Sequence, residues 1–358
     1  MDAESQDLAW VDDPVQAQAL AQRLRGLSAL AVDTEFVRQQ TYRARLGLIQ
    51  IHDGTRPVLV DPLPAGVLDA LREVFTAPIP LIIHSASEDL EVLGQAFGQV
   101  PTQLFDTQIA EVMLGADPPP GYQKLVQREL GIELPKQAQR TDWLKRPLDA
   151  EQLRYAAEDV AWLPTIADRQ RDALTRLGRW DWFAEECARL CERVRAAQDP
   201  NPHLKIKSCE RFTPLQQQRL WRLLRWRDAE AMARDRPKNW ILDQGVAVRV
   251  ALLDRIDRSS LESATQIDGR ASPRVAAKIE AVLAQAASEQ ELKIPLARPL
   301  EEAEKQRAQD LREHVQIKAE ELGIAPEFLC NRRGLEHWAR YGELPEDLRG
   351  WRQRLLAL

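Results

Sequence analysis

The 358-residue chain lacks the glycine-rich phosphate loops of Rossmann and P-loop proteins, because neither G-x-G-x-x-G nor G-x-x-x-x-G-K-[ST] occurs in it. It has four cysteines and no Cys-x-x-Cys pair, so we expect no zinc site and reduced thiols in a cytoplasm. No run approaches the roughly 18 apolar residues that a membrane span needs. The acidic N-terminus also lacks the features of a signal peptide. We therefore expect a cytoplasmic protein without a membrane segment.

Charge is unevenly distributed along the chain. Residues 1–200 carry 21 basic and 31 acidic side chains, a balance of −10, whereas residues 201–358 carry 28 basic and 24 acidic ones, a balance of +4. The net charge of −6 argues mildly against nucleic-acid binding, but this difference predicts an acidic first part and a separate basic second part. A solvated charge bias without any partner is the alternative.

Strand patterns come first in the chain and mix with helical patterns later. Apolar runs predict strands at 29–36, 46–51, 58–60 and 80–84, and helical spacing predicts helices at 15–24, 66–75, 107–114, 122–130, 148–163 and 182–195. Asp149 and Gln152 form the capping-box signal at the start of the helix at 148–163. The pattern predicts an α/β domain of about 190 residues. Two prolines, Pro200 and Pro202, mark a linker, and only helical patterns follow it.

Acidic residues on these elements suggest a metal site. Asp33 and Glu35 are two residues apart in a strand and therefore project to the same face. Adjacent carboxylates repel each other unless a cation, a proton or water intervenes. Tyr155 and Asp159 are four residues apart and lie one above the other on a helix. A surface tyrosine beside a solvated aspartate is the ordinary explanation of that pair, so its meaning depends on the acids upstream.

Asp89 is the third carboxylate candidate. It lies in the first turn of the helix that follows the strand at 80–84, a position that the helix dipole alone also favours. Together Asp33, Glu35, Asp89 and Asp159 could hold two hard cations through oxygen ligands. Two cations about 3.5–4 Å apart stabilise the attacking and the leaving oxygen of a phosphoryl displacement. Such chemistry would need neither a nucleophilic serine or cysteine nor a glycine-rich loop.

Three segments resemble the exonuclease motifs of the DEDD superfamily of 3′→5′ exonucleases. They read V-D-T-E-F (Val32–Phe36), H-S-A-S-E-D-L (His84–Leu90) and L-R-Y-A-A-E-D-V (Leu153–Val160). Tyr155 stands where another branch of the superfamily has histidine, which indicates the tyrosine-type subgroup. The bacterial ribonuclease D family is indicated by T-Y-R-A-R-L-G-L-I-Q-I (Thr41–Ile51), L-F-D-T-Q-I-A (Leu104–Ala110) and G-Y-Q-K-L-V-Q-R-E-L-G-I-E-L-P-K (Gly121–Lys136).

The later helices resemble HRDC domains. The stretch L-W-R-L-L-R-W-R-D-A-E-A (Leu220–Ala231) is similar to the start of such a domain, and the last segment resembles a second, more divergent unit. The resemblance implies a ribonuclease H-like α/β exonuclease domain, with a mixed central sheet flanked by helices, followed by all-α HRDC-type domains. The implied boundaries are a catalytic domain at 1–198, a linker at 199–212, an HRDC domain at 213–292 and an HRDC-like domain at 303–358.

The resemblance also implies roles for the site residues. Asp33 would bridge two divalent ions, Mg²⁺ or Mn²⁺, while Glu35 and Asp159 would complete the site of the ion that binds the attacking water. Asp89 would support the second ion, and Tyr155 would orient the water. These five residues are the predicted catalytic set, and the four acids are the predicted metal ligands.

Four residues are weaker candidates for substrate binding. Phe36 either stacks on the terminal base of the substrate or packs in the core. Three basic residues either bind substrate phosphates or lie on the solvated surface: Lys124, Lys136 and Arg140. Three tryptophans could stack on unpaired bases: Trp221, Trp226 and Trp240. Their helical spacing is more typical of residues in a core.

The resemblance implies a metal-dependent 3′→5′ exoribonuclease. Its expected substrates are the 3′ tails of structured RNA such as tRNA precursors, and its products are nucleoside 5′-monophosphates. A DNA exonuclease of a proofreading or repair type is one alternative, because nothing in the chain evidently reads a 2′-hydroxyl. A non-catalytic nucleic-acid-binding protein that works through its HRDC units is another, and metal chelation would leave its activity unchanged.

Overall fold

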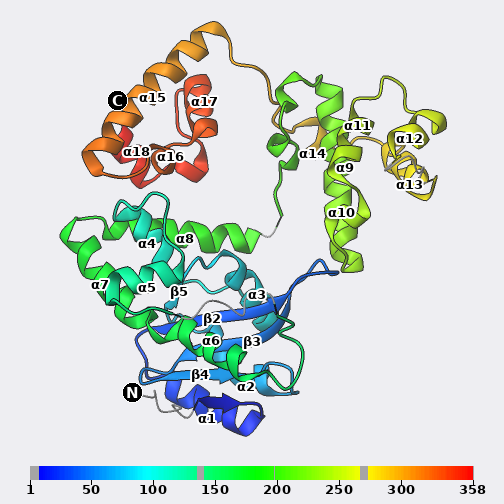
Figure 1. Ribbon diagram of the computed structural model, residues 1–358. Coiled ribbons are helices and arrows are strands. Elements are labelled where there is room, and N and C mark those ends of the chain that lie inside the picture. The colour runs from blue at the N-terminus through cyan, green and yellow to red at the C-terminus, as the bar shows by residue number, and fades with distance from the viewer. Residues whose placement is uncertain (1–7, 135–140, 197, 267–272, 358) are drawn as a thin grey trace. The chain divides into compact units, whose positions relative to one another are not determined.

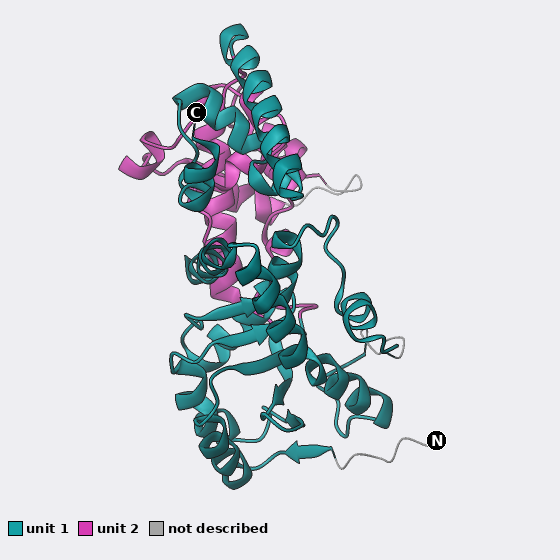
Figure 2. Ribbon diagram, turned by 90° about the vertical axis from the view of Figure 1, so that its left-hand side faces the viewer, with its two compact units in different colours: residues 1–37, 45–197, 301–358 teal, residues 38–44, 198–300 magenta. Residues whose placement is uncertain are grey.

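A computed structural model describes residues 8–134, 141–196, 198–266 and 273–357. Contacts divide the chain into two compact units (Figure 2). Unit 1 contains Met1–Val37, Arg45–Ala197 and Glu301–Leu358, and unit 2 contains Arg38–Ala44 and Gln198–Leu300. The C-terminal helices thus share a unit with the α/β domain. The four-part division expected from the sequence stays a prediction.

A six-stranded mixed sheet forms the centre of unit 1 (Figure 1). Its order is β1 (Ala9–Val11), β4 (Pro57–Val60), β3 (Arg45–His52), β2 (Leu30–Val37), β5 (Leu81–Ile83) and β6 (Leu104–Asp106). The strands β2, β3 and β4 pair antiparallel, whereas the other neighbours pair parallel. The sheet confirms the expected mixed α/β fold. The three-residue strands β1 and β6 were not predicted, because they are too short to show a period of two.

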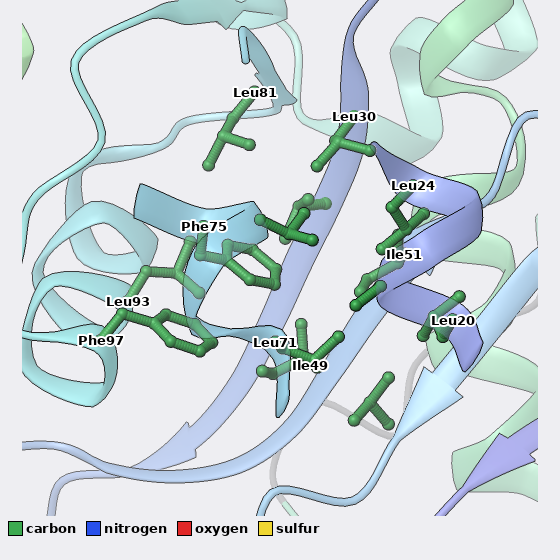
Figure 3. Close-up of a cluster of buried hydrophobic side chains, with 14 of the residues drawn as sticks. Leu20, Leu24, Leu30, Ile49, Ile51, Leu71, Phe75, Leu81, Leu93 and Phe97 are labelled. Carbon is green, nitrogen blue, oxygen red and sulfur yellow. The ribbon is translucent and has the colours of Figure 1, made fainter. Parts of the chain in front are cut away.

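One face of the sheet is buried under α1 (Pro14–Leu24), α2 (Val67–Thr76) and α3 (Ser87–Phe97). Leucine, isoleucine and phenylalanine side chains from these helices and from β2 and β3 form one core (Figure 3). Phe75 and Phe97 stack there with ring centroids 4.4 Å apart. Each fully buried side chain of this kind contributes about 1.5–3 kcal/mol. Because residues alternate along a strand, β2 directs Val32 into this core and turns Asp33 to the opposite face.

The opposite face of the sheet carries α6 (Ala150–Ala161), which contacts β2, β3 and β4. Its start is the predicted capping box, in which the Asp149 side chain accepts from the Gln152 N–H, 2.9 Å away. The helix ends earlier than expected, and α7 (Leu163–Arg176) follows directly. The break is explained by Pro164 in the first turn of α7, since proline lacks an N–H and constrains the residue before it.

Further helices lie at the β5–β6 end of the sheet: α4 (Thr107–Met113) and α8 (Trp180–Ala196) contact β6, and α5 (Tyr122–Leu130) packs against Ile166 of α7. The Tyr122 hydroxyl ties α5 to α6, because it donates to the Glu158 carbonyl 3.2 Å away and accepts from the Trp162 N–H 3.3 Å away. Tyr122 therefore fixes the C-terminal turn of α6, where the predicted site residue Asp159 lies.

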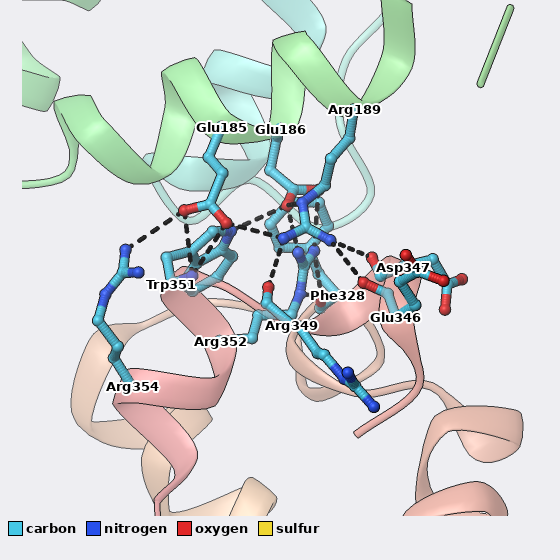
Figure 4. A network of polar contacts seen from close by, with 10 residues as sticks. All are labelled: Glu185, Glu186, Arg189, Phe328, Glu346, Asp347, Arg349, Trp351, Arg352 and Arg354. Carbon is cyan, nitrogen blue, oxygen red and sulfur yellow. Dashed lines mark hydrogen bonds and ion pairs between the residues drawn. The ribbon is translucent and has the colours of Figure 1, made fainter. Parts of the chain in front are cut away.

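The last helices of the chain are α15 (Glu302–Leu322), α16 (Pro326–Leu329), α17 (Arg332–Tyr341) and α18 (Trp351–Leu356), and α18 docks on α8 (Figure 4). The buried guanidinium of Arg352 pairs with Glu186 through both carboxylate oxygens. The Trp351 indole N–H donates to the same carboxylate at 2.9 Å, and its ring stacks on Trp182. A buried charge is tolerated only with partners of this kind.

Unit 2 is built from α9 (Pro214–Arg234), α10 (Lys238–Ile241), α11 (Gln244–Ala251), α12 (Arg258–Ala264), α13 (Pro273–Leu283) and α14 (Glu289–Leu292) around its own apolar core. Thr213 and Gln216 form a capping box at the start of α9. The tip of the β2–β3 hairpin, residues 38–44, also belongs to this unit. None of the described helices has the length and apolar character needed to cross a membrane.

Candidate active site

Three of the predicted acids meet on the α6 face of the sheet. Asp33 and Glu35 project from β2, and Asp159 comes from α6. One carboxylate oxygen of each lies within 4.8 Å of the other two. Divalent cations bind carboxylate oxygens at about 2.0–2.6 Å, so an ion between these three groups can contact all of them. Within the described ranges this is the one cluster of His, Cys, Asp or Glu with metal-binding spacing.

Asp89 lies beside this cluster and does not belong to it. It comes from the first turn of α3 and is 7% exposed. Its carboxylate accepts a hydrogen bond of 2.5 Å from the Thr34 hydroxyl. Its charge still contributes to raising the pKa of Asp33, which places it within electrostatic range of the cluster.

The surroundings of the four acids disfavour their charged forms and raise their pKa values. Burial, followed by repulsion from Asp159 and Asp89, raises the pKa of Glu35 from 4.5 to about 8. Burial raises the pKa of Asp159 to about 7 and that of Asp89 to about 6. Burial and repulsion from Asp89, Asp159 and Glu35 raise the pKa of Asp33 well above its usual value. Since a divalent cation would offset this repulsion, the all-oxygen donor set fits a hard ion such as Mg²⁺ or Mn²⁺.

Tyr155 is held against the cluster from two sides. Its hydroxyl hydrogen-bonds to Asp159, and its ring packs against Trp143 with centroids 6.1 Å apart. Trp143 is itself buried against Gly47 of β3, where a Cβ atom would lie only 2.7 Å from the Trp143 carbonyl oxygen. Burial and the nearby carboxylates raise the pKa of Tyr155, so its hydroxyl stays protonated and can donate a hydrogen bond.

Gln50 is a site residue that sequence reasoning missed. It is the cross-strand partner of Asp33 in the β2–β3 register and is completely buried. Neither its amide oxygen nor its amide nitrogen has a hydrogen-bond partner among the described residues. A buried amide without a partner is costly, so the donor and acceptor beside Asp33 also fit a hydrated ion. The available signal was a single polar residue within the apolar run L-G-L-I-Q-I.

Asp106, within a stretch that pointed to the family, also has a structural role that the sequence did not reveal. Its buried carboxylate caps α4 and at the same time holds the turn before α3. It accepts hydrogen bonds of 2.8–3.2 Å from the backbone N–H groups of Ser85, Ala86, Gln108 and Ile109. Ser85 has a φ of 63°, a strained left-handed conformation that these bonds stabilise. The carboxylate thereby fixes the start of the helix that carries Asp89.

The weaker substrate candidates are dispersed. Phe36 is half-buried at a register shift that follows Glu35 in β2, and Lys124 is exposed on α5. Lys136 and Arg140 lie outside the described residues. A role for any of these four in substrate binding stays a prediction.

Replacing Thr34 by valine tests how Asp89 is held. Thr34→Val keeps the side-chain volume but removes the hydroxyl that donates to Asp89. We expect about tenfold weaker binding of Mn²⁺ in isothermal titration calorimetry, because groups that orient metal ligands typically contribute that much. Thr175→Val, which removes a hydroxyl bonded to a backbone carbonyl on the surface of α7, is the matched control. Equal Mn²⁺ affinity in both variants would contradict a supporting role for Thr34.

Comparisons with known proteins agree with this geometry. A family model described as 3′-5′ exonuclease matches residues 8–174. Ribonuclease D from Xanthomonas oryzae pv. oryzae is 37% identical to the chain, over 97% of the chain and 96% of the relative. Ribonuclease D from Pseudomonas paraeruginosa is 33% identical, over 97% and 95%.

A solved structure extends the likeness to the fold. The crystal structure of Escherichia coli RNase D, described as an exoribonuclease involved in structured RNA processing, has a TM-score of 0.84 and 27% sequence identity. The match covers 98% of this chain and 97% of that one. The resemblance inferred from the motifs is confirmed: the chain belongs to the ribonuclease D family of 3′→5′ exonucleases.

Proposed function

We propose that the chain trims the 3′ tails of structured RNA, tRNA precursors among them, and releases nucleoside 5′-monophosphates. The main support is the meeting of Asp33, Glu35 and Asp159 within 4.8 Å in a chain whose relatives are ribonucleases D. The four cysteines are free and buried, which suits a reducing cytoplasm as the place of action.

The acids are proposed to hold two divalent ions, Mg²⁺ or Mn²⁺. Asp33, Glu35 and Asp159 would hold one, and Asp33 with Asp89 the other. When bound, such a pair activates the attacking water and stabilises the leaving 3′ oxygen of the shortened RNA. The raised pKa values of Glu35 and Asp159 keep these acids partly protonated near neutral pH, so metal binding releases protons and strengthens as pH rises.

Tyr155 is proposed to position the attacking water. Its protonated hydroxyl, held between Asp159 and the Trp143 ring, gives that water a fixed hydrogen-bond partner beside the carboxylates. Gln50 and Thr34 act through other groups, since Gln50 faces Asp33 across the strands and Thr34 fixes Asp89.

Replacing Tyr155 by phenylalanine should lower kcat about a hundredfold, because it removes the hydroxyl without removing a metal ligand. Single-turnover shortening of RNA measures the effect, and metal affinity should change little. Tyr341→Phe, an exposed tyrosine on α17, is the control. An unchanged kcat in Tyr155→Phe would remove Tyr155 from the mechanism.

The direct test of the function uses RNA labelled at its 5′ end. The purified chain is incubated with the RNA and Mg²⁺ or Mn²⁺, and the expected result is a ladder that shortens from the 3′ end. A DNA oligomer of the same sequence tests the choice of nucleic acid, and we expect slower shortening of the DNA. No shortening of RNA with either ion, or preferred shortening of DNA, would overturn the proposal.

A further inference from the structure

An exposed tryptophan in unit 2 has no role in the core. Of the three tryptophans that could stack on bases, Trp221 is buried and Trp226 is half-buried against the core of unit 2. Trp240, on the short helix α10, is 60% exposed. The Arg236 guanidinium lies 6.0 Å from the centroid of its ring. An exposed indole with a cation beside it is an arrangement that stacks on unpaired bases.

The tip of the β2–β3 hairpin extends this surface, and in Figure 2 it has the colour of unit 2. The Arg43 N–H donates to the Asp235 carboxylate at 2.9 Å, and Arg236 donates to the Gln40 carbonyl. A second aromatic–cation pair is formed by Lys238, whose ammonium lies 5.8 Å from the ring centroid of Tyr42. The hairpin tip and the α9–α10 corner thus present two aromatic rings, each with its own cation.

The charge of this surface suits a polyanion. Residues 38–44 and 234–240 carry five basic side chains and one acid, Asp235, whose carboxylate accepts from the backbone N–H of Arg43. Lys238 and Arg234 pair with acids of α9, Asp228 and Glu230, so part of the positive charge is balanced. The guanidinium groups of Arg43 and Arg236 are exposed and have no carboxylate partner within the described residues.

We propose that the tip surface, formed by Tyr42, Arg43, Arg236, Lys238 and Trp240, binds the unpaired 3′ tail of the RNA substrate by stacking and by phosphate contacts. The inference rests on the proposed function, because it assigns a tail-binding surface to that substrate. Every base has a π face, so stacking of this kind tolerates any sequence, as an enzyme that removes successive nucleotides requires.

Chain connectivity limits the distance between this surface and the catalytic strand. Tyr42 is seven positions after Glu35, so their Cα atoms can be at most about 25 Å apart in any arrangement of the units. A tail of several nucleotides can therefore reach both the catalytic strand and the tip surface whatever the arrangement of the units. The tip surface should affect long tails more than the shortest substrates.

The test measures binding and hydrolysis separately on the full chain. Fluorescence anisotropy with a single-stranded RNA of about 12 nucleotides, in a metal chelator, gives the Kd without cleavage. We expect Trp240→Ala to weaken binding by about tenfold and Trp240→Phe to retain most of the affinity. Leu292→Ala, which removes an equally exposed apolar side chain elsewhere in unit 2, should leave the Kd unchanged. Hydrolysis of a dinucleotide should differ less among the four proteins than the Kd of the 12-nucleotide RNA does.

The outcomes separate this inference from the proposed function. If Trp240→Ala binds the RNA as tightly as the wild type, the surface is not an RNA site and a protein partner becomes its occupant. Equal losses in Trp240→Ala and Leu292→Ala would also overturn the inference. If Trp240→Ala alone loses affinity, the inference stands even where the wild type fails to shorten RNA, because binding is measured without hydrolysis.

Discussion

Replacing Asp159 or Asp33 by alanine is expected to slow RNA shortening by about a thousandfold or more, because each change removes a carboxylate that is proposed to hold the catalytic ions. The fold should survive both changes. The two carboxyls are buried among like charges, so their removal relieves repulsion in the absence of metal. Single-turnover shortening of a 5′-labelled RNA at saturating Mg²⁺ measures the loss.

A control on the same helix separates chemistry from stability. Glu151→Gln changes an exposed acid in the first turn of α6 and should keep the wild-type rate. Thermal melts in a chelator should show that Asp159→Ala and Asp33→Ala remain folded. Full metal-dependent activity in either alanine variant would refute the assignment of these acids, whatever the likeness to ribonuclease D.

The metal-free chain is expected to lose stability as pH rises from about 4.5 to about 8. An unfolded glutamate ionises near 4.5, whereas the pKa of folded Glu35 is about 8, so the folded chain binds more protons between these values. Unfolding free energy therefore falls with rising pH in that window. The contribution of Glu35 is on the order of 5 kcal/mol.

Calorimetric melts of wild type and Glu35→Gln across this pH range, in a chelator, measure the effect. The neutral amide removes the titration, so at high pH the variant should melt roughly 5–10 °C above the wild type. Adding Mn²⁺ at high pH should restore the wild type and affect the variant much less, because the ion stabilises only the chain that binds it. Parallel pH profiles for the two proteins would show that Glu35 ionises as freely in the fold as in the unfolded chain.

The sequence predicted the parts of the fold that have a local signal. Strands β2 to β5 are apolar runs between turns, and the Asp149–Gln152 capping box marks the start of α6 within one turn. The strands β1 and β6 were not predicted, because neither lies in an apolar run as long as the one that marks β5. The predicted end of α6 lies too late in the sequence. Pro164 disfavours the helical conformation of the residue before it, and the continuous apolar spacing gave no sign of this break.

The sequence predicted the acids that the structure brings together, but it did not reveal the residues that support them. Asp33 and Glu35 were recognised by their two-residue spacing in a strand, and Asp159 by its motif. The structure brings these three carboxylates together. Gln50 and Thr34 owe their positions to strand register and to the packing of α3, which join residues far apart in the sequence. No local pattern could reveal that Thr34 bonds to an acid 55 positions later. Roles for Lys136 and Arg140 stay predictions.

The docking of α18 on α8 has a consequence for genetic truncation. A premature stop codon anywhere in the helical half of the gene would spare every acid of the site, and yet it would delete the Arg352 guanidinium that neutralises Glu186. It would also remove the Trp351 indole that stacks on Trp182, so that Trp182 and Glu186 of α8 would both be exposed to water. Such nonsense alleles should behave as losses of the nuclease itself, and shortened enzymes that still cut RNA should be rare among them.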